Sequence, residues 1–208
     1  DCVFDGGSGG IDLRCGAFYV KVTYSHFENM SDAAGAWGIR TGDGTSNLTD
    51  TVIVTGCTIE DIKSTGGTGS TYGVQVNKGG HVIVENNSIR DIDNDDEDDC
   101  EGIYVEGDSA IVCSNTLVDA AAKEAQIALK AATYTICNGN IIFQTENRDK
   151  APGITIQTSN VTCKDNIIVN PYQRGIWVAG ASNPGSILIE ENQIINTVGD
   201  ATGSGLAG

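Results

Sequence analysis

Apolar and polar residues alternate in short runs along the whole chain, and one pattern of residues returns at nearly regular intervals. In seven segments a small polar residue is followed two places later by an apolar residue. The small polar residues read Ser25, Cys57, Asn87, Asn115, Asn140, Asn166 and Asn192, at spacings of 32, 30, 28, 25, 26 and 26 residues. Repeats of this length are typical of a solenoid, in which each repeat forms one turn and contacts only its neighbours.

Each repeat also contains a second short strand, usually of the form G-I-x-V. These strands are GIDL at 10–13, GIRT at 38–41, GVQV at 73–76, GIYV at 102–105, QIAL at 126–129, GITI at 153–156 and GIWV at 175–178. Their apolar residues alternate with a period of two, so we expect Ile103 and Val105 to face inward and Tyr104 to face outward.

The small polar column predicts a ladder of stacked amides. In parallel turns, like side chains lie above one another, so asparagines on successive turns can hydrogen-bond along the axis and satisfy buried backbone groups. The predicted ladder residues are Asn87, Asn115, Asn140, Asn166 and Asn192. A second polar column of Asn29, Asp61, Asp91, Asp119, Gln144, Asn170 and Asn196 is expected to cap turns.

The recurring G-I-x-V and N-x-I-x-[ND] elements resemble right-handed parallel β-helix repeats, the architecture of pectate lyases, other polysaccharide-processing enzymes and phage tailspikes. The resemblance covers essentially all 208 residues. It implies an all-β fold, namely a right-handed parallel β-helix of about seven coils. We expect a single domain over 1–208, which is either a segment of a longer solenoid or a subunit of an assembly. One fold hosts many functions, so the resemblance says less about chemistry.

The composition of the chain excludes some classes of binding partner. The chain has 28 acidic against 12 basic residues and a formal charge of −16, which disfavours nucleic acids. Apolar runs are too short to span a bilayer, so membrane insertion is not expected. No polar cap is evident at either end, which favours a homo-oligomer or neighbouring domains that cover the terminal turns.

The outward residues of the G-I-x-V strands and their flanks predict a carbohydrate-binding face. A long polar face with spaced aromatic rings suits an extended chain of sugars, and the resemblance implies that this face carries substrate. The predicted binding residues are Arg40, Gln75, Asn77, Tyr104, Glu106, Lys130, Gln157 and Trp177. We therefore expect an extracellular or virion protein, similar to an adhesin or tailspike, that binds polysaccharide.

Whether the chain is an enzyme is left open by the sequence. A lyase needs a base and a cation that offsets a uronate carboxylate, for which Arg40, Tyr104, Glu106 and Lys130 are candidates. A hydrolase needs two carboxylates, for which Glu106 and Glu101 could serve. The signatures of mannuronan epimerases and polygalacturonases are missing. Two alternatives therefore stand beside the adhesin, a structural solenoid that assembles head to tail in a fibre and a secreted lyase or glycoside hydrolase.

An acidic run over 91–101 is a candidate calcium site. Hard oxygen ligands at alternate positions suit Ca²⁺, and the candidate ligands are Asp91, Asp93, Asp95 and Glu97. The competing interpretation is a solvated acidic loop, because the run lacks the glycine and the final glutamate of an EF-hand loop.

Overall fold

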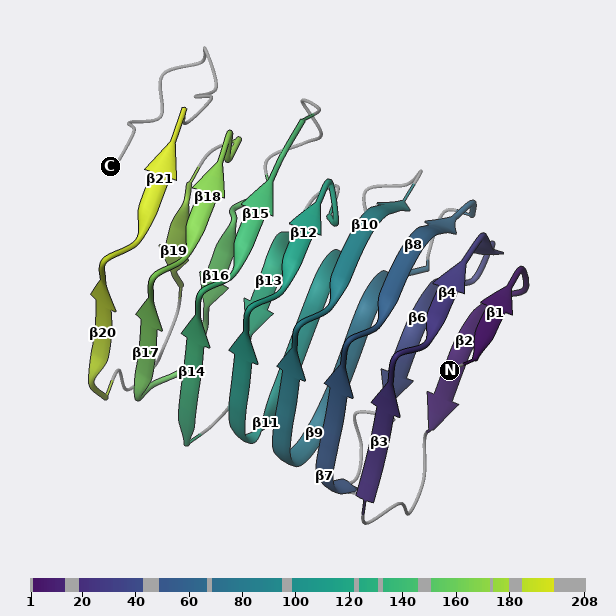
Figure 1. Cartoon of the computed structure of the whole chain (residues 1–208), viewed down its shortest axis with the longest axis horizontal. Coiled ribbons are helices and arrows are strands. Elements are labelled where there is room, and N and C mark those ends of the chain that lie inside the picture. The colour runs from purple at the N-terminus through teal and green to yellow at the C-terminus, as the bar shows by residue number, and fades with distance from the viewer. Residues whose placement is uncertain are drawn as a thin grey trace.

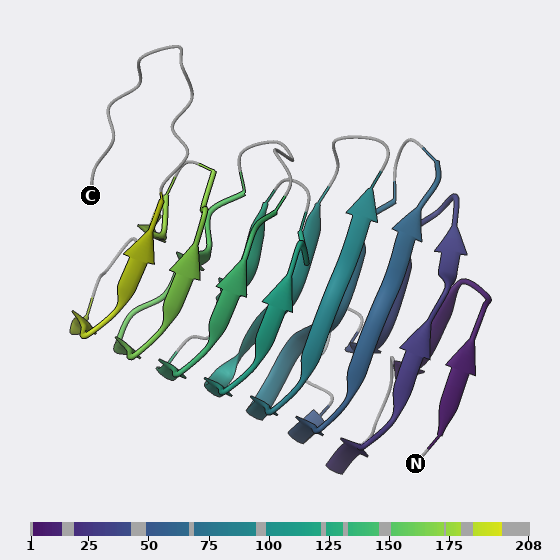
Figure 2. The ribbon, with the colours of Figure 1, turned by 45° about the horizontal axis from the view of Figure 1, so that its top comes forward.

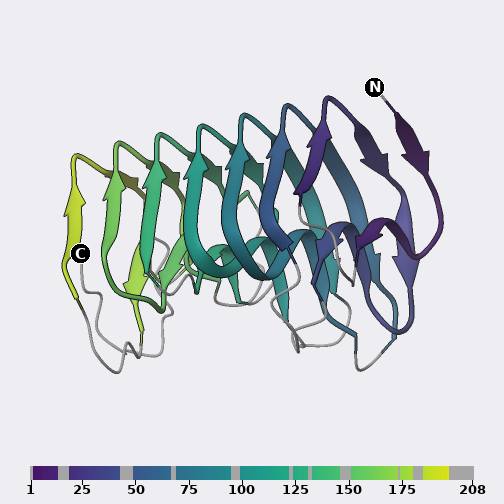
Figure 3. The ribbon, with the colours of Figure 1, turned by 90° about the horizontal axis from the view of Figure 1, so that it is seen from below.

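The chain winds into a parallel β-solenoid. The computed structural model describes residues 2–13, 19–42, 49–66, 69–94, 99–121, 124–130, 133–145, 151–172, 174–179 and 185–196. All regular elements in these ranges are β-strands, and every strand pair recorded among them is parallel. Figure 1 shows the turns side by side from the N-terminal to the C-terminal end, and Figure 3 shows them as successive coils. No helix that could cross a membrane occurs in the described residues.

Sheet 1 contains the strands that follow the asparagine column. Its order is β1-β4-β8-β10-β12-β15-β18-β21, with β5 also paired to β8. The strands are β1 (Val3–Asp5), β4 (His26–Glu28), β5 (Met30–Asp32), β8 (Thr58–Ser64), β10 (Ser88–Asn94), β12 (Thr116–Val118), β15 (Ile141–Phe143), β18 (Ile167–Val169) and β21 (Gln193–Ile195). Figure 2 shows these strands as one continuous row.

Sheet 2 contains two rows of strands. The G-I-x-V row consists of β2 (Gly9–Leu13), β6 (Ala36–Thr41), the first half of β9 (Thr71–Glu85), the first half of β11 (Cys100–Cys113), β13 (Ala125–Leu129), β16 (Ile154–Ile156) and β19 (Ile176–Val178). The second row consists of β3 (Tyr19–Thr23), β7 (Thr49–Thr55), the second halves of β9 and β11, β14 (Tyr134–Asn138), β17 (Val161–Lys164) and β20 (Ile187–Glu190). In β9 and β11 both rows belong to one strand, and the register shifts between Val105 and Gly107.

The strand register confirms the predicted columns. Ile103 pairs with Val74 and Ile127, and Ile89 pairs with Ile59 and Leu117. These side chains are fully buried in one core that runs the length of the solenoid. About five turns, from β6 to β18, have a neighbouring turn on both sides, and the expected count of about seven coils also includes the two terminal turns. The all-β parallel β-helix is thus confirmed.

The asparagine ladder forms as predicted. Asn140 Nδ2 donates to Val112 O at 2.9 Å and to Asn166 Oδ1 at 2.9 Å, while Asn140 Oδ1 accepts from Asn115 N and Nδ2 at 3.1 and 3.0 Å. The same pattern links Asn87 to Asn115, and Asn166 to Asn192. Each amide therefore satisfies a backbone carbonyl of the preceding turn and a backbone N–H of its neighbour.

Two positions of the repeat adopt a left-handed backbone, and Gln144 is the exception in the second of them. The residue before each ladder position has φ between 50° and 66°, and these residues are Tyr24, Gly56, Asn86, Ser114, Gly139, Asp165 and Glu191. The second polar column has the same conformation at Asn29, Asp61, Asp91, Asp119, Asn170 and Asn196. Asn and Asp tolerate this region better than other residues with a side chain. The left-handed backbone therefore explains why Asn and Asp recur in the second polar column, to which the sequence pattern assigned only a capping role.

The buried cysteines are core filler. Cys137 and Cys163 occupy paired positions on β14 and β17 and are fully buried free thiols. A hydrogen bond with the Cys163 thiol, together with burial, raises the pKa of Cys137 and keeps it protonated. A small neutral thiol fits this inward column as a small apolar side chain would.

Replacing a central ladder residue is expected to destabilise the fold. In Asn140→Leu the Val112 carbonyl and the Asn115 N–H lose their partners while buried, which should cost roughly 1–3 kcal/mol or more. Urea unfolding measures the change in free energy. Asn192→Leu is the control, because Asn192 is only half-buried and should cost less. Equal stability of Asn140→Leu and wild type would contradict the ladder as a source of stability.

Extending the ladder is expected to stabilise the fold. Cys57 occupies a ladder position without an amide, and its Sγ lies 3.8 Å from Val22 O, where Asn87 Nδ2 donates to Val54 O at 3.0 Å. In Cys57→Asn the new amide should reach Val22 O and the Ser25 backbone N–H, for a gain of about 1 kcal/mol. The measurement is the urea midpoint, with Cys57→Ala as the control that removes the thiol and adds no amide.

Candidate functional site

The outer face of the G-I-x-V row brings the predicted carbohydrate-binding residues into register. Arg40 pairs with Gln75, Gln75 with Tyr104, and Thr155 with Trp177, while Ala128 fills the position between Tyr104 and Thr155. The stacking of rungs thus places Arg40, Gln75, Tyr104 and Trp177 in one column along the axis, which we call the outer column. Asn77, Glu106, Lys130 and Gln157 follow two residues later on their own turns.

Exposure along the outer column is uneven. Tyr104 and Gln75 are each only 9 % exposed, whereas Trp177 is 37 % exposed. Tyr104 points away from the main core, as expected, but it belongs to a second apolar cluster with Tyr72, Ala125 and Ala128, against which Trp37 also packs. The outward direction expected for Tyr104 is therefore confirmed, and the centre of the face is a cluster of buried side chains.

Three cations lie over aromatic rings of this face. The Arg40 guanidinium lies 3.4 Å from the centroid of Trp37, the Lys130 ammonium 4.7 Å from that of Tyr104, and the Arg174 guanidinium 4.6 Å from that of Trp177. Arg40 also forms an ion pair with Asp12 at 2.7 Å. Such pairs hold long basic side chains against the sheet and fix where their charges lie.

Glu101 is the most unusual group at this face. It precedes the G-I-x-V strand of its turn, pairs with Tyr72 and Ala125, and is only 3 % exposed. Its Oε2 has no hydrogen-bond partner. Burial, and then the charges of Asp99 and Glu124, raise its pKa to about 8, although Lys130 acts in the opposite direction. Glu101 is therefore protonated at neutral pH and buried at a cost in stability.

A second carboxylate completes the cluster. Tyr104 donates its hydroxyl to Glu106 Oε2 at 3.0 Å, and the Tyr104 ring meets Tyr72 edge to face at 5.8 Å. Burial, and the neighbouring Glu106, raise the pKa of Tyr104, so its hydroxyl stays a donor. Glu101, Tyr104, Glu106 and Lys130 form what we call the Tyr104 cluster. It combines a protonated carboxyl, a second carboxylate, a phenol and a cation.

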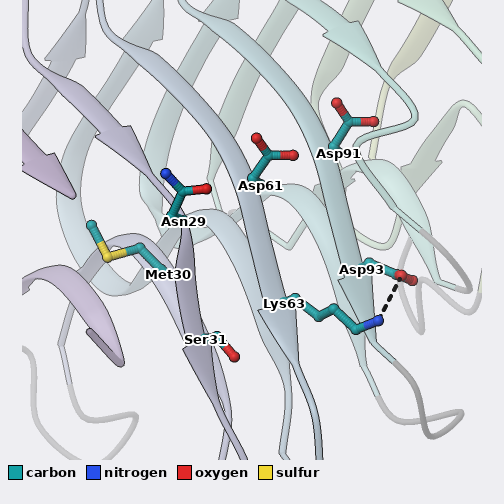
Figure 4. A pocket seen from close by; sticks show the side chains of 7 residues that line it. All are labelled: Asn29, Met30, Ser31, Asp61, Lys63, Asp91 and Asp93. Carbon is teal, nitrogen blue, oxygen red and sulfur yellow. Dashed lines mark ion pairs between the residues drawn. The ribbon is translucent and has the colours of Figure 1, made fainter. Parts of the chain in front are cut away.

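The predicted calcium ligands lie apart from this cluster. Asp91 and Asp93 line an open hollow of about 490 Å³ on sheet 1, together with Asn29, Met30, Ser31, Asp61 and Lys63. Figure 4 shows Asn29, Asp61 and Asp91 as a row on successive strands, with Lys63 turned towards Asp93. The Lys63 ammonium lies 3.8 Å from Asp93 Oδ2. Asp95 and Glu97 fall outside the described residues, so the Ca²⁺ site stays a prediction of the sequence.

Comparison with known proteins agrees with this architecture. A family model described as "Right handed beta helix region" matches residues 44–206. The chain belongs to the right-handed β-helix family. No curated protein and no solved structure matches it. The family accounts for the stacked rungs and leaves the chemistry of the Tyr104 cluster to its own residues.

The sequence pattern identified most members of the Tyr104 cluster, but it did not predict that Glu101 would be buried and protonated. The G-I-x-V alignment placed Tyr104, Glu106 and Lys130 on one face, and Glu101 entered only as a possible second acid. The β-helix pairs Glu101 with apolar or aromatic neighbours on both sides, which removes it from water. The alignment column Trp37, Tyr72, Glu101 and Ala125 was the available signal, since it places one acid among three residues without charge.

The raised pKa of Glu101 predicts how stability depends on pH. Its ordinary value is 4.5 and its folded value is about 8, so the unfolded chain loses this proton first as the pH rises. Relative to Glu101→Gln, the wild type should lose stability across this window at up to about 1.4 kcal/mol per pH unit. Below about pH 4.5 the two proteins should be equally sensitive to pH. Urea unfolding of both proteins across this range is the measurement, and a constant difference between them would contradict the shift.

Proposed function

We propose that this β-helix is an extracellular or virion protein that binds polysaccharide along the outer face of its G-I-x-V row, with the Tyr104 cluster at the centre. The supporting geometry is the outer column, which carries polar or aromatic groups on all rungs from Arg40 to Trp177 except that of Ala128. An extended sugar chain can follow such a column, with its hydroxyls on amides and charges and its ring faces on aromatic side chains.

One observation carries the proposal, namely the buried carboxyl of Glu101 among aromatic rings. A buried polar group without a partner costs stability, and perturbed carboxyls of this kind gather at functional sites. The equivalent positions of the neighbouring turns are Trp37, Tyr72 and Ala125, so the fold itself does not require a carboxyl at this position. Glu101 is therefore better explained by a ligand than by folding.

The Tyr104 cluster also contains the groups that cleavage would use. A carboxyl that stays protonated at neutral pH can protonate the leaving oxygen of a glycosidic bond, and a second carboxylate can act as base or nucleophile. Glu101 has the first property, and Glu106 is the acid that accepts from Tyr104. Lys130, over the Tyr104 ring, could offset the charge of an acidic sugar.

A glycan array with neutral and acidic polysaccharides tests the binding face. Trp177→Ala should weaken binding about twofold to tenfold, because stacking on an aromatic ring contributes on the order of 0.5–1.5 kcal/mol. Tyr134→Ala is the matched control, since Tyr134 is an exposed aromatic residue of the second strand row. Equal loss in both variants, or no binding by the wild type to any polysaccharide, would sink the proposal.

Cleavage is tested separately with the polysaccharides that bind. Release of reducing ends without absorbance of unsaturated uronates indicates a hydrolase, and reducing ends together with that absorbance indicate a lyase. Glu101→Gln should keep binding within about twofold and lose at least about a hundredfold in rate, because Gln cannot donate the proton. Binding without product from the wild type would identify an adhesin.

The structure also favours a second candidate, a structural solenoid that stacks end to end. In the last described turn, Ile189 and Ile194 are 43 % and 44 % exposed, whereas Cys163 and Ile168 one turn earlier are fully buried. Another turn, from a second copy or a neighbouring domain, would cover these side chains. Light scattering should then show concentration-dependent polymers, which Ile194→Lys should abolish while Tyr134→Lys does not.

A further inference from the structure

The outer surface of sheet 1 holds a second cluster of chemistry-bearing side chains, on different strands from the Tyr104 cluster. His26 and Glu28 lie on β4 with one residue between them, so both face outward, and Glu60 lies on β8. The pairing of Phe27 with Ile59 places Glu60 directly beside Glu28, and Arg90 follows Glu60 on β10. This inference does not depend on the proposed function.

The donor atoms of three of these side chains converge. His26 Nε2 lies 2.8 Å from Glu60 Oε1 and 3.9 Å from Glu28 Oε2, and all three ligand atoms lie within 4.8 Å of one another. Ligands bound at about 2.0–2.2 Å to one tetrahedral or octahedral ion lie about 2.9–3.5 Å apart. The observed separations bracket that range, so small side-chain rotations would bring the three atoms onto one ion.

The surroundings also fit a metal site. Arg90 bonds to Oε2 of Glu60, which leaves Oε1 directed towards His26, as outer partners of ligating carboxylates do. The Glu60 side chain is 11 % exposed, whereas those of His26 and Glu28 are 37 % and 30 % exposed. One ligand is thus fixed against the sheet and two face solvent, so an ion can enter and keep open positions for water.

We propose that His26, Glu28 and Glu60 form a binding site for a divalent transition-metal ion such as Zn²⁺. One imidazole nitrogen with two carboxylate oxygens suits Zn²⁺, Co²⁺ or Mn²⁺ better than Ca²⁺, which prefers an all-oxygen set. Three protein ligands with open positions are typical of zinc sites that bind or activate water. The competing arrangement is an ion-pair network in which protonated His26 bridges the two carboxylates and binds no metal.

Isothermal titration of the EDTA-treated full chain with Zn²⁺ alone tests the site. We expect one ion per chain, and at least about tenfold weaker binding in His26→Ala and in Glu60→Gln. The chain contains only one other histidine, His81, which lies on β9 and bonds to Ser109 Oγ at 2.6 Å. His81→Ala is therefore the matched control and should bind Zn²⁺ like the wild type.

Proton NMR of the wild type tests the site even if a variant does not fold. Addition of Co²⁺ should shift or broaden the imidazole signals of His26 and leave those of His81 unchanged. The spectrum of His81→Ala assigns the two sets of signals. Absence of Zn²⁺ binding by the wild type, equal affinity in His26→Ala, or equal perturbation of both imidazoles would overturn the proposal and leave the ion-pair network.

Discussion

The structure depends on one constraint, that each turn lies directly over the next in register. Each side chain then has the equivalent residue of the next turn as its neighbour, so an interaction between two equivalent side chains is repeated along the axis. For amides the repetition is favourable, because each Asn of the ladder donates to one neighbour and accepts from the other. For aliphatic side chains it produces a continuous core. For charges it is unfavourable, since like charges directly opposite repel.

The same constraint fixes the corners of the coil. All turns but that of Gln144 pass through two left-handed positions, and most of these positions are occupied by Gly, Asn or Asp. Tyr24, Ser114 and Glu191 are exceptions that adopt the conformation directly before a residue of the small polar column, where each such residue costs roughly 1–2 kcal/mol. Beside Ser114 and Glu191 the ladder amides of Asn115 and Asn192 offset part of that cost, so the ladder and the strained corner form one unit of the repeat there.

Sequence reasoning reached the parts of this molecule that repeat. The spacing of Asn115, Asn140 and Asn166 was enough to predict which atoms would meet, because a solenoid converts sequence period into spatial contact. The parts that depend on non-repeating segments were out of reach. Nothing in the G-I-x-V alignment indicated that Tyr104 would be 9 % exposed while Trp177, in the same column, would be 37 % exposed. The site formed by His26, Glu28 and Glu60 lies between these cases. The strand register places Glu28 beside Glu60, but it does not predict that the His26 ring turns towards Glu60.

The carboxylates of this acidic chain differ in how their charge is offset, and this difference indicates which of them are candidates for functional sites. Asp93 has the ammonium of Lys63 nearby, and Glu60 has Arg90 on one side, so in both cases a cation offsets the charge. Glu101 has no such partner at hydrogen-bond distance and is neutralised by a proton. The Glu28 and Glu60 pair is neutralised on one side only, and the remaining charge faces His26 and solvent. The β-helix stacks like charges on successive turns. The carboxylates that no cation of the chain fully offsets, Glu101 and the pair of Glu28 and Glu60, are therefore the candidates for functional sites, because they need a proton or a bound ion.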